Sequence, residues 1–198
     1  TRYPVDNSLD GLCIPPHSIE AEQSVLGGLM LDNRAWDQVS AQLTERDFYR
    51  RDHRLIYTAI GDLVAGERPS DAVTLADHLS QLGQIEAAGG LVYLARLARD
   101  TPSAANIQAY AAIVRERSVL RQLIEVGTDI SDSGFKPGGR DITSLLDEAE
   151  RKVFEIAERS AAHRQGYRPV KSFLAETMKH IERLMKQDDP ITGLATGY

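Results

Sequence analysis

The chain has a single cysteine, Cys13, among its 198 residues. One cysteine excludes an intrachain disulfide and a cysteine-based zinc finger, and such low cysteine usage is typical of a reducing compartment. Apolar runs stay far below the ~20 residues that a membrane-crossing helix needs. No charged-then-apolar segment opens the chain as a secretory signal would. We therefore expect a cytoplasmic protein with no membrane partner.

The sequence also has no excess of positive charge. It carries 29 acidic side chains against 23 lysines and arginines, a net charge of −6. The first 102 residues hold 15 acids and 9 bases, and the rest hold 14 of each. Phosphate contacts need a basic surface, so tight nonspecific binding of DNA by this chain is not expected. The cluster Arg50, Arg51 and Arg54 is either a local nucleic-acid contact or a solvated helix face.

Motifs that carry catalysis are missing as well. There is no Walker A loop and no GxGxxG, HExxH, GxSxG or EF-hand pattern. The histidines have no partner at metal-ligand spacing, and Cys13 has no paired histidine that would make it a nucleophile. The residues therefore predict an interaction module without a catalytic site, metal or cofactor of its own. A small helical enzyme that uses Asp52 and His53 is a minor alternative.

Apolar residues recur at helical spacing along the chain, and no stretch alternates apolar and polar residues as a strand would. The fold class is therefore predicted to be all-α. Residues 1–14 read as a flexible arm, and residues 15–102 as a globular bundle of five or six short helices. Ser18 is placed as the N-cap of the first helix, with Glu20 and Glu22 in its first turn. Thr44 and Asp47 have the spacing of a capping box.

Residues 103–160 are predicted to form a long antiparallel helical hairpin. Its first helix runs from Ser103 to about Asp132 and is interrupted only by Gly127, which marks either a bend or a tolerated position. A turn rich in Gly and Pro follows, and Asp141 caps the second helix. A hairpin has few core contacts of its own, so we expect it to pair with another hairpin or a neighbouring chain.

Residues 161–198 are predicted to be a linker that carries a separate amphipathic helix over residues 170–187. Phe173, Leu174, Met178, Ile181 and Met185 belong to its apolar stripe. An isolated helix of this length is marginal in water. The helix therefore either docks on another domain or subunit or folds back onto the hairpin.

Several ordered segments resemble one known family. They are PPHSIEAEQSVLGGLMLDN from Pro15, DFYRRDHRLIY from Asp47, TPSAANI-x-AYA-x-IVRER from Thr101, DEAERKVFEIAE from Asp147 and ITGLATGY from Ile191. Together they are similar to the N-terminal domain and linker of DnaB, the bacterial replicative DNA helicase. The resemblance covers nearly the whole chain from Pro15 onward.

The resemblance implies that this chain is the front part of a longer, ATP-dependent DNA helicase. A missing motor domain would bind ATP and Mg²⁺ and make the main DNA contacts. In this family the globules and hairpins associate in pairs, and three pairs form a collar on a hexameric ring. The collar receives the helicase-binding domain of primase, and helicase loaders engage the protein near the linker helix.

The resemblance also implies two sets of contact residues. Tyr93, Leu120, Ile124 and Ile130 correspond to the primase-contact region, although these residues could instead pack the hairpin pair or its internal seam. Phe173, Leu174, Met178, Ile181 and Met185 correspond to the linker-helix face that docks on the adjacent subunit. A free-standing all-α adaptor is the alternative function. We expect the helicase instead, because the sequence stops within the segment ITGLATGY that leads into the family's motor domain.

Overall fold

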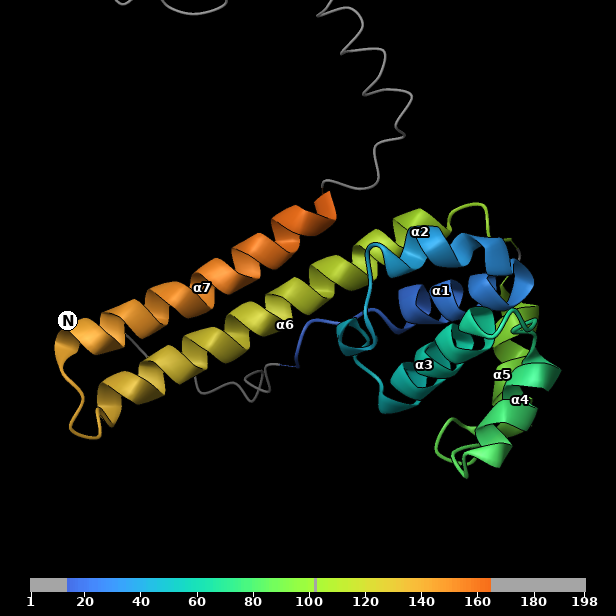
Figure 1. The fold of residues 1–198 in the computed structure, drawn as a ribbon, viewed down its shortest axis with the longest axis horizontal. Coiled ribbons are helices and arrows are strands. Elements are labelled where there is room, and N and C mark those ends of the chain that lie inside the picture. The colour runs from blue at the N-terminus through green and yellow to red at the C-terminus, as the bar shows by residue number, and fades with distance from the viewer. Residues whose placement is uncertain (1–13, 102, 165–198) are drawn as a thin grey trace, which may run out of the picture. The chain divides into compact units, whose positions relative to one another are not determined.

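The computed structural model describes residues 14–101 and 103–164, with side chains up to residue 158. Every regular element in these ranges is a helix, which confirms the all-α class. In chain order they are α1 (Ile19–Leu31), the 3-10 helix η1 (Asn33–Ala35), α2 (Trp36–Ser40), the 3-10 helix η2 (Glu45–Asp47), α3 (Arg51–Ala65), α4 (Ala72–Gln81), α5 (Gly90–Asp100), α6 (Ile107–Phe135) and α7 (Ile142–Arg164). Figure 1 shows α2, α3, α5 and the start of α6 around α1, while α4 packs on α3 and α5. The expected helix over residues 170–187 lies outside the described residues.

Helix α1 is the centre of the globule. It packs on α3, α5 and α6, and every residue from Val25 to Met30 is buried. This half of the helix is apolar on all sides, so it needs neighbours on all sides, and α3, α5 and α6 supply them. Phe48, Ile56, Ile60, Leu75, Leu79 and Leu94 are among the fully buried side chains that complete this core.

The helix caps follow the local sequence signals. Ser18 Oγ accepts a hydrogen bond from the backbone N–H of Ala21 at 3.3 Å, as predicted for the start of α1. The capping box of η2 is also present, with the Asp47 carboxylate 2.7 Å from the backbone N of Thr44. Such caps satisfy backbone N–H groups that have no partner inside the helix.

Helix α6 belongs to the globule and to the hairpin at once. Its N-terminal half is buried against the globule through Ile107, Ala111, Val114 and Ser118. The C-terminal half runs on without interruption, and Gly127 introduces no break. The helix ends at Phe135 rather than near Asp132, so Gly134 does not terminate it. The domain boundaries expected from the sequence stay predictions.

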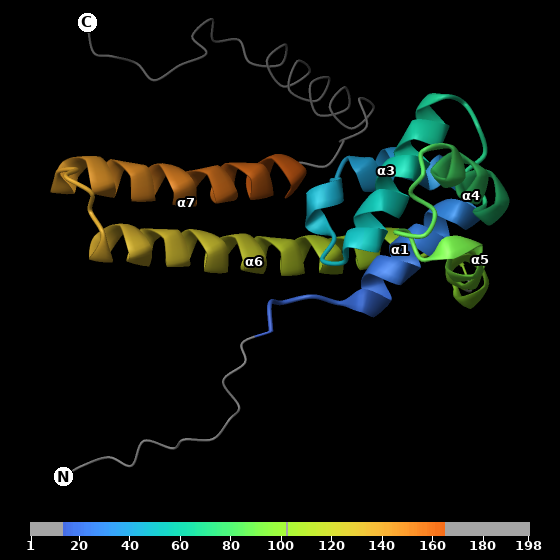
Figure 2. The same ribbon diagram turned by 90° about the horizontal axis from the view of Figure 1, so that it is seen from below.

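Helices α6 and α7 lie side by side and run in opposite directions (Figure 2). A six-residue turn joins them, and Gly138 and Gly139 in it have φ values of 60° and 79°. These left-handed conformations favour glycine. Ile130 lies in the seam beside Leu145 and Ala149 of α7. Farther along α7, Ile156 is 7% exposed, so the two helices share a narrow apolar strip.

Candidate functional site

The structure distributes the four predicted contact residues over two elements. Tyr93 lies in α5 and is half-buried in the globule. Leu120, Ile124 and Ile130 lie in α6, but they do not share one environment. Ile124 is 55% exposed, Leu120 is half-buried, and Ile130 lines the hairpin seam. The second predicted set, from Phe173 to Met185, lies outside the described residues.

Tyr93 is held in place by its hydroxyl group and by its ring. The hydroxyl lies 2.7 Å from Nε2 of His53 and accepts a hydrogen bond from Nε2 of Gln23 at 3.1 Å. The guanidinium carbon of Arg50 lies 5.7 Å from the ring centroid. These contacts fix the side chain, so its ring presents one orientation to the surroundings.

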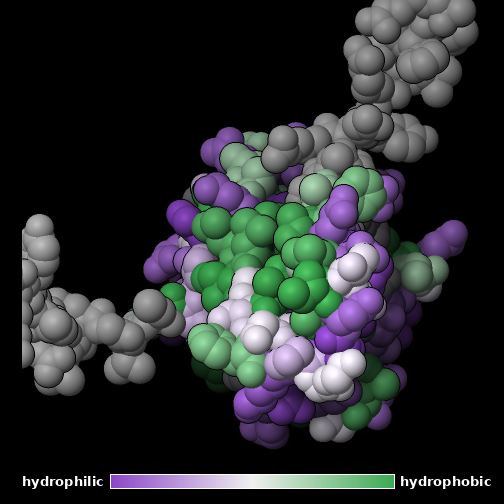
Figure 3. Space-filling model, turned by 90° about the vertical axis from the view of Figure 1, so that its left-hand side faces the viewer, coloured by the Kyte–Doolittle hydropathy of each residue, from purple (hydrophilic) through white to green (hydrophobic). Residues whose placement is uncertain are grey.

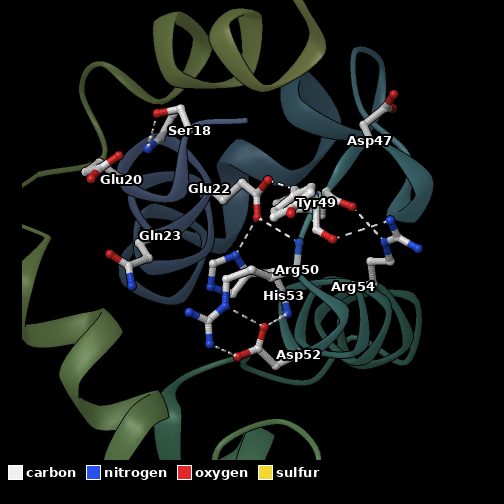
Figure 4. Close-up of polar contacts among 12 residues, drawn as sticks. Ser18, Glu20, Glu22, Gln23, Asp47, Tyr49, Arg50, Asp52, His53 and Arg54 are labelled. Atoms are coloured by element: carbon white, nitrogen blue, oxygen red, sulfur yellow. Dashed lines mark hydrogen bonds and ion pairs between the residues drawn. The ribbon is translucent and has the colours of Figure 1, made fainter. Parts of the chain in front are cut away.

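His53 connects Tyr93 to a buried carboxylate. Its Nδ1 lies 2.6 Å from Oε2 of Glu22, and the two side chains are 0% and 1% exposed. Glu22 also accepts hydrogen bonds from the backbone N–H groups of Tyr49, at 2.7 Å, and Arg50, at 3.4 Å. Figure 4 shows this carboxylate between His53 and the segment that leads into α3.

One arrangement of protons satisfies the whole cluster. An ionised carboxylate only accepts hydrogen bonds, so Nδ1 of His53 donates to Glu22. Nε2 of a neutral imidazole then accepts from the Tyr93 hydroxyl, whose oxygen accepts from Gln23. Every polar atom of this path has a partner, as buried polar groups require. The cluster therefore joins α1, α3 and α5 through directional bonds.

Asp47 makes a second buried polar contact, which ties the globule to the hairpin helix α6. Its side chain is 1% exposed and lies 2.7 Å from Nη1 of Arg115. It also accepts a hydrogen bond from Oγ of Ser118 at 2.7 Å. One turn further along α6, Arg121 donates to the backbone oxygens of Pro16 and Asp47 at 2.7 and 2.6 Å. Nearly two turns of α6, from Arg115 to Arg121, are thus bound to Asp47 in η2, and Arg121 also binds the segment before α1.

Asp52 and His53 do not form an acid–base pair. The carboxylate of Asp52 accepts from the Arg50 guanidinium. Burial is the largest single influence and raises the pKa of Asp52. The hydrogen bonds to the carboxylate, of which the bond from Arg50 is the largest cause, together with the charge of Arg50 outweigh it, so the net shift of the pKa is downward. The ring of His53 is fully buried and bonded at both nitrogens. The geometry therefore gives no support to an enzyme built on these two residues.

The basic cluster in the same region is partly used inside the protein. Arg50 pairs with Asp52, and Nε of Arg54 donates to the backbone oxygen of Phe48 at 2.6 Å. These bonds favour a structural role over a nucleic-acid contact. Within residues 14–101 and 103–158, no group of three or more His, Cys, Asp or Glu side chains could hold a metal ion. No helix of the described part is long and apolar enough to cross a membrane.

The sequence places Glu22 in the first turn of α1, where the helix dipole favours an acid, and it indicates no metal-ligand partner for His53. The structure instead buries both. A signal was present, because Glu22 is spaced three, four and seven residues before Val25, Leu26 and Leu29. It therefore lies on the apolar face of α1, where a charge requires a partner.

A family model described as "DnaB-like helicase N terminal domain" matches residues 14–116, which include the globule and the first turns of α6. The chain belongs to this family. The replicative DNA helicase DnaB of Haemophilus influenzae is 44% identical over 98% of this chain and 42% of its own length. The DnaB of Geobacillus stearothermophilus is 42% identical over 93% of this chain and 40% of its own length. The chain thus spans about two-fifths of the curated DnaB relatives that it matches.

Solved structures agree with this assignment to the DnaB family. The crystal structure of the N-terminal domain of DnaB helicase from Mycobacterium tuberculosis has a TM-score of 0.69 at 40% identity. That likeness covers 72% of this chain and 99% of the other. A DnaB-like replicative helicase, described together with its interactions with primase, has a TM-score of 0.58 at 23% identity. That likeness covers 90% of this chain and 37% of the chain of the DnaB-like helicase, and it shows the same fold.

Proposed function

We propose that this chain is the collar and linker region of a cytoplasmic, hexameric, ATP-dependent replicative DNA helicase. Its role is to assemble subunits and to recruit primase and a helicase loader. The observation that carries the proposal is the match of 98% of this chain to 42% of a replicative helicase. ATP, Mg²⁺ and the main DNA contacts belong to the remaining part of such a protein. The match favours a helicase region over a free-standing adaptor.

Self-association is supported by the surface of the hairpin. Five large apolar side chains on α6 and α7 are more than half exposed, namely Ile124 at 55%, Phe135 at 83%, Ile142 at 76%, Leu146 at 65% and Phe154 at 58%. Figure 3 shows apolar side chains gathered on the end of the hairpin. Exposed apolar patches of this kind mark protein–protein contacts, so we assign the hairpin to pairing between subunits.

Primase recruitment is assigned to Tyr93 and to the exposed part of α6 around Ile124. The ring of Tyr93 is already held in one orientation, so the side chain would lose little conformational entropy on binding a partner. This property suits a contact residue. Ile124 has the exposed apolar surface. The half-buried Leu120 and the seam residue Ile130 fit the primase contact less directly, and their position favours packing of the hairpin or of a hairpin pair. Docking of the linker helix through Phe173, Leu174, Met178, Ile181 and Met185 is part of the same proposal.

The proposal is tested by light scattering on a sizing column, with and without the helicase-binding domain of the cognate primase. A dimer or larger species that shifts on addition of primase is the expected result. The variant Ile124→Asp should lose this shift because it places a charge in an apolar contact. Val73→Asp is the matched control, since Val73 is 71% exposed on α4 of the globule. A wild-type chain and a full-length protein that both ignore primase would refute the recruitment role.

A further inference from the structure

A cleft lies between η2 and α3 of the globule and the helices α6 and α7 of the hairpin. Figure 2 shows α7 running back along α6 toward the globule. The cleft has a volume of about 860 Å³, and three of its lining residues are Arg54 from α3 and Arg115 and Arg121 from α6. We propose that this cleft binds a nucleoside phosphate, with the phosphate held by Arg54 and Arg121. This binding site does not depend on the proposed roles in assembly and primase recruitment.

Backbone carbonyls of three consecutive residues hold the two guanidinium groups in place. Nη2 of Arg121 donates to the carbonyl oxygen of Asp47 at 2.6 Å. Nε of Arg54 donates to the carbonyl oxygen of Phe48 at 2.6 Å, and its Nη2 donates to that of Tyr49 at 3.4 Å. Figure 4 shows Arg54 beside Tyr49. The protein itself therefore brings two cationic side chains together before any ligand is bound.

Within the described residues, neither Arg54 nor Arg121 forms an ion pair. A carbonyl oxygen accepts a hydrogen bond but carries no net charge, so both side chains keep an unpaired positive charge. Burial is the largest cause that lowers the pKa of Arg121, the Glu22 carboxylate opposes it, and the charge of Arg54 lowers the pKa further. An anion bound between the two arginines would relieve this repulsion, because an opposite charge at about 4–6 Å stabilises a cation.

The third arginine takes up the one buried carboxylate of the cleft. Nη1 of Arg115 lies 2.7 Å from Oδ1 of Asp47. The two oxygens of Asp47 also accept from Ser118 and from the backbone N–H of Thr44. Asp47 is therefore fully used and cannot also bond to the other two guanidinium groups. Nε of Arg115 is buried and has no partner in the described part of the chain, so the protein does not satisfy every donor around the cleft.

Most of the other charged side chains of the lining are taken up in ion pairs. Arg46 pairs with Glu45, Glu155 with Arg151, and Lys152 with Glu148, at 3.7, 2.7 and 3.1 Å. These pairs leave the two guanidinium groups that hang on backbone carbonyls as unpaired cations of the lining. An added anion therefore has a place to bind, although the net charge of the whole chain is −6.

The charge and size of the cleft favour a nucleoside phosphate over a single carboxylate. Two guanidinium forks match a phosphate, which carries a charge of about −1.5 to −2 at pH 7, whereas a carboxylate balances only one of them. The cleft is much larger than a phosphate and falls in the range of about 300–1,000 Å³ that is usual for small-molecule sites. Glu125 is exposed in the same lining and can accept hydrogen bonds from sugar hydroxyl groups, and Val126 adds apolar surface for a base.

The test uses the 198-residue chain, which has no Walker A loop, so a nucleotide that binds it must use another site. Isothermal titration calorimetry with inorganic pyrophosphate and with ATP should show binding of both, and tighter binding of ATP. Arg54→Gln should raise both dissociation constants about tenfold or more, because a charge-assisted contact is lost. Arg51→Gln is the matched control, since Arg51 is also exposed on α3 but does not line the cleft; it should leave both constants unchanged.

A second variant keeps the test decisive if Arg54→Gln disturbs the fold, which circular dichroism would detect. Glu125→Lys changes an exposed position and adds a positive charge to the lining, so it should lower the dissociation constant of pyrophosphate about threefold or more. Unchanged binding in this variant would overturn the proposal. Wild-type protein that binds neither probe at millimolar concentration would also overturn it. Equal losses in Arg51→Gln and Arg54→Gln would do the same, because binding would then reflect general surface charge. ATP that binds no more tightly than pyrophosphate would overturn the nucleoside part of the proposal.

Discussion

The carboxylate of Glu22 lies 2.6 Å from Nδ1 of His53, and neither side chain has contact with solvent. The two residues come from different helices and are 31 positions apart in the chain. Their bond closes the junction of α1 with the segment before α3, because the same carboxylate accepts from the backbone of Tyr49 and Arg50. The charged residue on the apolar face of α1 is thus a fixed part of the core.

Replacing Glu22 with alanine should lower the free energy of unfolding by about 3 kcal/mol, because a buried imidazole N–H and two backbone N–H groups lose their acceptor. Urea unfolding followed by circular dichroism measures this change. Glu20→Ala is the matched control, since Glu20 lies in the same first turn of α1 but is exposed. Equal effects of the two substitutions would show that the cluster does not stabilise the globule.

Replacing Tyr93 with phenylalanine separates the hydroxyl group from the ring. The variant loses the bonds to His53 and Gln23, so we expect a loss of about 1 kcal/mol in stability. The ring remains available for a partner, and binding of primase should change less than in Tyr93→Ala. The prediction fails if Tyr93→Phe and Tyr93→Ala weaken primase binding equally.

Two glycines should respond oppositely to alanine. A Cβ on Gly27 would clash with the side chain of Thr101 and lie 2.5 Å from the backbone oxygen of Leu97. Gly27→Ala should therefore destabilise the globule by about 2 kcal/mol or more. At Gly127, inside α6, nothing lies within 4 Å of the added carbon. Gly127→Ala should raise stability by up to about 1 kcal/mol, because alanine favours the helix. Thermal unfolding compares both variants directly, and a loss of stability at Gly127 would show that a close neighbour needs the glycine there.

The start of α4 should contribute a small pH dependence. The Asp71 carboxylate accepts hydrogen bonds from the backbone N–H groups of Val73 and Thr74 at 2.8 and 3.1 Å. The bond to Thr74 is the largest cause that holds the pKa of Asp71 below its usual value. A depressed pKa means that the stabilisation is present above the unfolded-state pKa near 4 and is lost as the pH falls.

Asp71→Asn tests this sign. Asparagine is also a good N-cap, so stability at pH 7 should change by less than about 1 kcal/mol. Between about pH 5 and pH 2, the variant should lose stability less steeply than the wild type. A parallel decline in both proteins would show that Asp71 does not titrate differently in the folded state.

The predicted linker helix over residues 170–187 gives a prediction for the full-length protein. Replacing both Phe173 and Met178 with aspartate should loosen the hexamer, because charges would enter the proposed apolar contact between subunits. Native mass spectrometry at low protein concentration would detect smaller species. Lys171→Asp and Lys179→Asp, which change the polar side of the same predicted helix, serve as controls. A ring that stays intact in the Phe173 and Met178 variant would reject the docking assignment.

Local patterns were the part of the fold that the sequence predicted well. The Ser18 cap and the Thr44–Asp47 box depend on residues within one turn of each other, so short spacing carries the information. The end of α6 was predicted too early because Gly134 suggests a helix stop. In the structure the helix ends at Phe135, and the backbone N–H of the C-cap residue Lys136 donates to the carbonyl of Asp132.

The polar clusters were the part that sequence reasoning missed. Glu22 meets His53 and Asp47 meets Arg115 across separations of 31 and 68 residues, and no local rule predicts such pairs. The position of Glu22 among Val25, Leu26 and Leu29 indicates burial but not its partner. The candidate contact residues were found by resemblance alone, and only the structure distinguishes the exposed Ile124 from Ile130 in the seam.

Because α6 is one continuous helix, its buried half in the globule determines the direction of the hairpin that extends from it. Its buried half ends at Ser118, and Phe135 lies 17 residues further on, at a distance of about 25 Å. A tilt of about 5° at the buried end would move Phe135 by about 2 Å. The contacts that hold the buried half of α6, including those of Asp47, therefore determine how precisely the end of the hairpin is positioned.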